Sequence, residues 1–139
     1  MKPIYLFITI IAGFLFFSCG KEEISGSFEL DTKKSFKINK EYQSDSHLLK
    51  FKITKVNDSR CPMDVECIWA GKVDVSIEVK SPATGNLVLS TINNIIDKST
   101  DTLGNYSFQL IKVLPYPVST KTIDLKDYEI TLKIEALEH

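Results

Sequence analysis

The strongest constraint on the fold is a strict alternation of apolar and polar residues between positions 72 and 80. The apolar positions are Val73, Val75, Ile77 and Val79, and polar or charged residues fill the positions between them. Successive side chains of a β-strand point to opposite faces of its sheet. The pattern therefore predicts a strand with one face in a core and the other in water.

The same two-residue period recurs along most of the chain after position 27. It predicts further strands over residues 28–30, 35–38, 49–56, 87–92, 106–114 and 128–134. The turn-forming residues from Ser81 to Asn86 predict a hairpin between the strands that flank them. No window has the period of an amphipathic helix. Short strands in this number favour an all-β antiparallel β-sandwich, immunoglobulin-like in general plan, with a small β-barrel as the alternative.

The first 18 residues have a composition of their own. Lys2 is followed by a nearly unbroken apolar run over positions 4–17. A charged start and an apolar core of this length are typical of an export signal, whereas a membrane-spanning helix needs about 20 apolar residues. The end of the run, Phe16-Phe17-Ser18-Cys19, resembles the lipobox of bacterial lipoproteins. The alternatives are a plain secretory signal and a short uncleaved helix.

The resemblance to a lipoprotein signal implies cleavage before Cys19 and attachment of lipid to that residue. Two or more acyl chains hold a protein on a membrane stably, at about 0.8 kcal/mol per buried CH₂ group. Residues 1–18 are then the signal peptide, 19–26 a flexible tether and 27–139 a single domain. The run Lys21-Glu22-Glu23 resembles an acidic export signal that sends lipoproteins to the cell surface in one phylum of Gram-negative bacteria. These resemblances imply a protein of the outer membrane, facing either the periplasm or the cell surface.

The cysteine count agrees with this interpretation. The chain has three cysteines, and once the lipid occupies Cys19, Cys61 and Cys67 remain. Exported proteins meet an oxidising compartment, so an even pair predicts a disulfide. Closing a loop of about seven residues is worth roughly 2.4 kcal/mol in the chain-entropy description.

Both of these cysteines lie in the segment 57–71, which separates two predicted strands. Its residues Asp58-Ser59-Arg60-Cys61-Pro62, Val65, Cys67, Trp69 and Gly71 follow the pattern D-S-R-C-P-x-x-V-x-C-x-W-x-G. The pattern resembles the signature of a group of small, largely uncharacterised bacterial secreted proteins and lipoproteins. The resemblance implies a β-rich exported domain, and it supplies no activity.

Local patterns also predict the placement of individual side chains around this segment. Alternation with Val73 and Val75 places Trp69 on the inward face, beside the disulfide. Pro62 suits the first position of a helical turn, which predicts a short one over residues 61–66. The sequence before Tyr128 admits a tyrosine corner, although an ordinary half-buried tyrosine is the simpler interpretation.

The segment is also the candidate binding loop, through Asp58, Arg60, Asp64, Glu66 and Trp69. The main interpretation of Arg60 is that it ties the loop to a carboxylate or to backbone carbonyls. The second is that a stiff loop presents Arg60 as the specificity residue of an inhibitor of exported proteases. The acidic residues are also of the type that binds Ca²⁺, but the segment has no D-x-D-x-D-G loop.

Other function classes find little support in the sequence. A hydrolase would have to use His47, because the only other histidine is the terminal His139. Two histidines and two oxidised cysteines make a poor zinc site. With 17 basic and 18 acidic residues and no basic patch, the chain is a poor match for nucleic acid. We therefore expect a non-enzymatic binding or structural module, without cofactor or metal, whose partner is an envelope protein or glycan.

Overall fold

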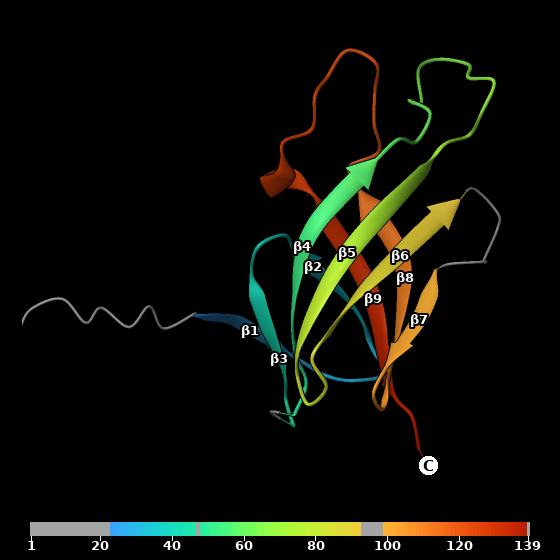
Figure 1. Cartoon of the computed structure of the whole chain (residues 1–139). Coiled ribbons are helices and arrows are strands. Elements are labelled where there is room, and N and C mark those ends of the chain that lie inside the picture. Colours follow the sequence, from blue (N-terminus) through green and yellow to red (C-terminus); the bar gives the residue numbers. More distant parts are fainter. Residues whose placement is uncertain (1–22, 47, 93–98, 139) are drawn as a thin grey trace, which may run out of the picture.

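The computed structural model describes residues 23–46, 48–92 and 99–138, which form a mostly antiparallel β-sandwich (Figure 1). One sheet has five strands in the order β1-β3-β4-β5-β6, and the other has four in the order β2-β9-β8-β7. The strands are β1 Ile24–Phe28, β2 Lys33–Lys37, β3 Glu41–Ser44, β4 Lys50–Asp58, β5 Lys72–Ser81, β6 Gly85–Ile92, β7 Thr100–Leu103, β8 Tyr106–Leu114 and β9 Glu129–Ala136. The two sheets pack together without closing on each other, so the predicted sandwich is confirmed and the barrel alternative is wrong.

Most neighbouring strands in each sheet are also neighbours in the chain. Strands β3 to β6 follow one another across the first sheet, and β7 to β9 do so across the second. The exceptions are β1, which pairs parallel with β3, and β2, which crosses to pair with β9. This connectivity places two long connections, residues 59–71 and 115–128, at the same end of the sandwich, which is the top in Figure 1.

The periodic segments of the sequence form strands close to their predicted bounds, except that the strand predicted over residues 28–30 is wrong, because only Phe28 of it lies in a strand. The predicted hairpin is confirmed, because β5 and β6 pair antiparallel from Lys72 opposite Ile92 to Val79 opposite Gly85. Strands β3 and β7 were not predicted. Each has four residues and only one large apolar side chain, Tyr42 or Leu103, which is too few to establish a period.

The flexible tether predicted over residues 19–26 extends too far along the chain. Strand β1 already begins at Ile24, and Gly26 lies opposite Tyr42 of β3. This strand could not be predicted before Phe28, because the serines and glycine after Ile24 show no alternation. Backbone pairing with β3 is what orders these residues.

The core lies between the two sheets and has an aromatic centre. Phe51 of β4 is fully buried. Its ring contacts four others, at centroid distances of 5.4 Å to Phe28, 5.1 Å to Phe36, 5.9 Å to Tyr42 and 5.9 Å to Phe108. The alternating residues of β5, from Val73 to Val79, are also buried, as their period predicted.

Several sequence predictions lie outside the described residues. They are the signal peptide over residues 1–18, the lipid site at Cys19 and the two histidines, His47 and His139. Within the described ranges, no helix has the length and apolar character that crossing a membrane requires.

Candidate functional site

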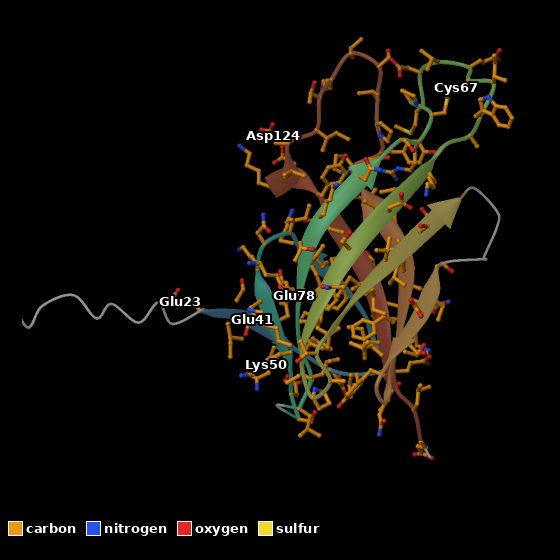
Figure 2. The ribbon with its side chains drawn as sticks, viewed as in Figure 1. Glu23, Glu41, Lys50, Cys67, Glu78 and Asp124 are labelled. Carbon is orange, nitrogen blue, oxygen red and sulfur yellow. A yellow bond between two sulfur atoms is a disulfide. The ribbon has the colours of Figure 1, made fainter. Side chains whose placement is uncertain are left out.

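The two long connections at one end of the sandwich are joined into a single surface. The backbone N–H of Met63 donates to the carbonyl oxygen of Pro117 at 3.0 Å. Ser119 donates to the carboxylate of Asp64 twice, from its N–H at 2.8 Å and from its hydroxyl at 2.5 Å. These bonds from Ser119 hold the pKa of Asp64 below its usual value, so Asp64 is charged at neutral pH. Figure 2 shows Cys67 of the first connection at the top of the view and Asp124 of the second below it.

The first connection is a closed loop with a defined base. At the base, the N–H of Ser59 donates to the carbonyl of Lys72 at 2.8 Å, and that of Cys61 to the carbonyl of Ala70 at 2.9 Å. Cys61 and Cys67 form the predicted disulfide, with their Cα atoms 5.9 Å apart. The loop is therefore closed twice, by the backbone bonds at its base and by the disulfide nearer its end.

The helical turn predicted over residues 61–66 is wrong. The segment has a turn in which the N–H of Val65 donates to the carbonyl of Pro62 at 3.4 Å. This single turn is not continued, and no helix is assigned to residues 61–66.

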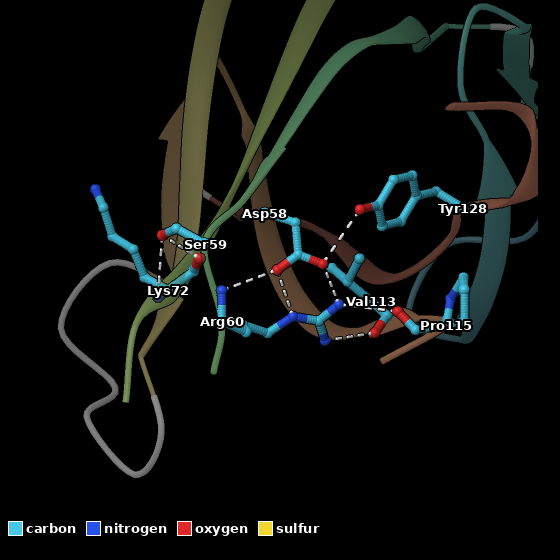
Figure 3. A network of polar contacts seen from close by, with 7 residues as sticks. All are labelled: Asp58, Ser59, Arg60, Lys72, Val113, Pro115 and Tyr128. Atoms are coloured by element: carbon cyan, nitrogen blue, oxygen red, sulfur yellow. Dashed lines mark hydrogen bonds and ion pairs between the residues drawn. The ribbon is translucent and has the colours of Figure 1, made fainter. Parts of the chain in front are cut away.

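Arg60 lies at the centre of a buried polar network (Figure 3). Its Nε and Nη2 donate to the two carboxylate oxygens of Asp58, at 2.8 Å and 2.6 Å. Its Nη1 donates to the carbonyl of Val113 at 2.9 Å, and Nη2 also donates to the carbonyl of Pro115 at 2.9 Å. The guanidinium lies 4.4 Å from the centre of the Tyr116 ring, a distance at which cation and ring attract.

This geometry bears directly on the two interpretations of Arg60. The arginine ties the loop to a carboxylate and to backbone carbonyls, as the main interpretation expected. Its side chain is only 7 % exposed and that of Asp58 only 5 %. An inhibitor's specificity residue must project into the protease pocket, and Arg60 points into its own protein. We therefore do not retain the inhibitor hypothesis.

Tyr128 completes the network from the other sheet. Its hydroxyl donates to the Oδ2 of Asp58 at 3.3 Å, so the tyrosine corner is wrong because the bond goes to a side chain of β4. The interpretation as a half-buried tyrosine is also wrong, because Tyr128 is buried. Burial raises the pKa of Tyr128 above its usual value, and the charge of Asp58 acts in the same direction. The network thus joins β4, the end of β8 and the start of β9.

The outer part of the loop exposes apolar side chains, which we call the apolar tip. It consists of Met63, Val65, Ile68 and Trp69, with exposed fractions of 68 %, 44 %, 94 % and 82 %. The prediction that Trp69 faces inward is therefore wrong. Strand β5 begins only at Lys72, and Gly71 has a φ of 68°, so the chain turns between Trp69 and the strand and the alternation does not extend back to it.

The candidate binding-loop residues fall into two groups. Asp58 and Arg60 are held in the buried network, and they support the loop from below. Asp64, Glu66 and Trp69 are exposed on its outer part. Among the residues that the structure describes, no three histidine, cysteine, aspartate or glutamate side chains lie close enough together to hold a metal ion.

Sequence reasoning missed Met63, Val65 and Ile68 as surface residues, and it missed Ser119 as the partner of Asp64. One sequence signal was available for the apolar tip. Ile68 and Trp69 lie between Cys67 and Gly71, where apolar residues are adjacent and do not alternate. Nothing local in the sequence marks Ser119, because it meets Asp64 only across two separate loops.

Replacing Gly71 with alanine is expected to lower the free energy of unfolding by about 1–3 kcal/mol, the usual range for a strained backbone position. Its positive φ disfavours any side chain, and a Cβ atom here would lie 1.9 Å from the carbonyl oxygen of Ser59. The loop base would have to open. Urea denaturation measures the loss, and hydrogen exchange at the amides of Ser59 and Cys61 reports the opening.

Gly26→Ala is the matched control for this variant. The nearest atoms to a Cβ at Gly26 belong to the Tyr42 ring at 3.9 Å, an ordinary contact. We expect little change in stability from it. Equal effects of the two substitutions would contradict the placement of Gly71 against Ser59.

Comparison of the chain with protein-family models, with curated proteins and with solved structures found no match. Function is therefore inferred from the chemistry of the loop surface itself.

Proposed function

We propose that the protein is a lipid-anchored, non-enzymatic binding module of the outer membrane of a Gram-negative bacterium. Cys19 carries the lipid, and the apolar tip is the surface that meets a partner in the cell envelope. The observation that carries this proposal is the group of exposed apolar side chains on a disulfide-closed loop.

The apolar tip is unusual in its concentration of exposed hydrophobic side chains. Its members lie within residues 63–69, whereas the other large exposed hydrophobics of the described ranges occur singly along the chain. They are Ile24, Leu48, Val88, Leu114, Leu125 and Leu137. Single exposed apolar residues are ordinary, but a cluster marks an interaction site. Tryptophan and methionine, both present here, are enriched in protein interfaces.

The loop is also restrained in its conformation in the absence of a partner. The disulfide, the backbone bonds at the base and the contacts with Pro117 and Ser119 all restrain it. Binding then costs less conformational entropy, because few of the groups at the interface have to be ordered. A rigid apolar surface of this kind suits a module that binds without chemistry.

A lipid anchor at Cys19 increases the benefit of such a surface. A module confined to a membrane meets membrane partners at a raised effective concentration, so a modest interface is sufficient. The lipobox resemblance supports this anchoring, and so does the even number of cysteines left for the disulfide.

Photo-crosslinking in living cells tests the proposal. With p-benzoylphenylalanine in place of Ile68, we expect crosslinked adducts with an envelope partner. The matched control places the same group at Val88, which is 53 % exposed on the edge strand β6, and we expect no such adduct there. Trp69→Ser should reduce the adduct from position 68, because it removes the neighbouring apolar surface.

The same cells also test the anchor. Cys19→Ala should release the protein from the membrane fraction and lower the yield of the adduct. The proposal is wrong if position 68 gives no adduct, or if positions 68 and 88 give the same adducts. It is also wrong if Cys19→Ala leaves the protein bound to the membrane.

A further inference from the structure

We infer that the partner of the apolar tip is a protein with an apolar pocket bordered by lysine or arginine side chains. This inference rests on the proposed function and specifies the chemistry of the partner. It follows from the charges that surround the apolar tip and from how far Ile68 and Trp69 project.

The charged residues of the loop are all acidic on its exposed part. Between positions 61 and 71 the charged residues are Asp64 and Glu66, and both are exposed. The only arginine of the chain, Arg60, is buried below them and paired with Asp58 at 2.6 Å. Its charge is thus compensated inside the protein and does not offset the two carboxylates at the surface.

The neighbouring connection does not offset this negative charge either. Between positions 115 and 128 it carries Lys121 and Lys126 as well as Asp124 and Asp127, so it is neutral as a whole. Lys126 also lies 3.5 Å from Asp124, within ion-pair distance. The two connections together therefore present apolar side chains with a net negative rim, and Lys72, which follows the loop, is paired with Asp74 at 3.0 Å.

A negative rim favours a protein partner over a phospholipid surface. Anionic headgroups attract basic segments and repel acidic ones, and insertion of the apolar tip into a bilayer would bring Asp64 and Glu66 against them. In a protein interface, by contrast, lysine or arginine side chains around a pocket would complement the rim.

The shape of the apolar tip favours a concave partner. Ile68 is 94 % exposed and Trp69 is 82 % exposed, so their own protein covers little of either side chain. Aromatic residues that contribute most to binding are typically those that fill a pocket in the partner and are surrounded by a polar ring. Trp69, three positions after Glu66 in the same exposed loop, fits this arrangement.

The test uses the full protein with p-benzoylphenylalanine at position 68. Glu66→Lys is expected to reduce the yield of the adduct by about tenfold, because it places like charges across the interface. The matched control is Glu29→Lys, which makes the same charge change at an exposed position after β1, and it should leave the yield unchanged. Changing a basic rim residue of the captured protein to glutamate should restore the adduct of the Glu66→Lys variant.

Three outcomes would overturn the inference. If the Glu66→Lys variant gives the same yield of adduct from position 68 as the unchanged protein, the partner has no basic rim. That result would not contradict the proposed function. An adduct of twice the chain's own mass would show a second copy as the occupant. Because Trp69 is the only tryptophan, its fluorescence reports on the tip alone. The protein is bound to vesicles of brominated phosphatidylethanolamine and phosphatidylglycerol, whose bromine atoms quench a tryptophan that enters the bilayer. Quenching of the Trp69 fluorescence in these vesicles would show a bilayer as the occupant.

Discussion

Replacing Asp58 with alanine is expected to lower the free energy of unfolding by about 3–5 kcal/mol, because it leaves a buried arginine without its counter-ion. Asp58 accepts from two nitrogens of the Arg60 side chain, from the Arg60 backbone N–H at 3.1 Å and from the Tyr128 hydroxyl. Alanine removes all four bonds at once. Urea denaturation of the purified variant measures the loss.

The cost is large because the network is buried. The side chains of Asp58 and Arg60 are only 5 % and 7 % exposed, so bulk solvent screens the unpaired guanidinium weakly. Arg60 would keep only its bonds to the carbonyls of Val113 and Pro115. These carbonyls carry partial charge and cannot neutralise the guanidinium.

Two further variants make this prediction specific. Removing both partners, in Asp58→Ala with Arg60→Met, should cost less than the sum of the single changes, because no unpaired charge then stays buried. Asp124→Ala removes the exposed pair with Lys126, whose side chains are 67 % and 78 % exposed, and its effect should be under about 1 kcal/mol. A loss from Asp58→Ala as small as that from Asp124→Ala would contradict the buried network.

Phe51→Ala is expected to destabilise the protein by about 3–5 kcal/mol, the usual cost of removing a buried phenylalanine ring. Phe51 is fully buried. Its ring contacts Phe28 and Tyr42 of its own sheet, and Phe36 and Phe108 of the facing sheet. Alanine would open a cavity between the sheets that the surrounding rings cannot fill. Urea or thermal denaturation measures the effect.

Trp69→Ala is the matched control, because it also removes an aromatic ring. Trp69 is 82 % exposed, and surface substitutions usually change stability by less than about 0.5 kcal/mol. We therefore expect Trp69→Ala to leave stability nearly unchanged while it weakens crosslinking from position 68. Similar losses of stability from Phe51→Ala and Trp69→Ala would show that Trp69 belongs to the core after all.

The extent to which the sequence predicted the fold depended on the length of its periodic segments. Strand β5 alternates from Lys72 to Lys80, and its inward apolar residues over this range are all buried. Strands β3 and β7, with four residues each, were missed. A short strand owes its existence to backbone pairing with its neighbours, and pairing leaves no period in the sequence.

The sequence likewise predicted only part of the candidate site. The sequence indicated the disulfide and the attachment of Arg60 to its own protein, because the residues concerned lie next to one another around Cys61. It failed at Trp69, where Gly71 interrupts the pattern with a φ of 68°. Alternation predicts the direction of a side chain only while the backbone stays extended.

By itself, the sequence determined that this chain forms packed β-strands, which of their faces are buried, and that two cysteines can close a loop between them. The tertiary structure alone decided that Val113, Pro115 and Ser119 meet that loop and that its apolar residues remain uncovered. The physical reason is the separation along the chain between the residues that interact. Strand periodicity and ring closure act between residues close in the chain, whereas the contacts of Arg60 and Asp64 join residues more than 50 positions apart.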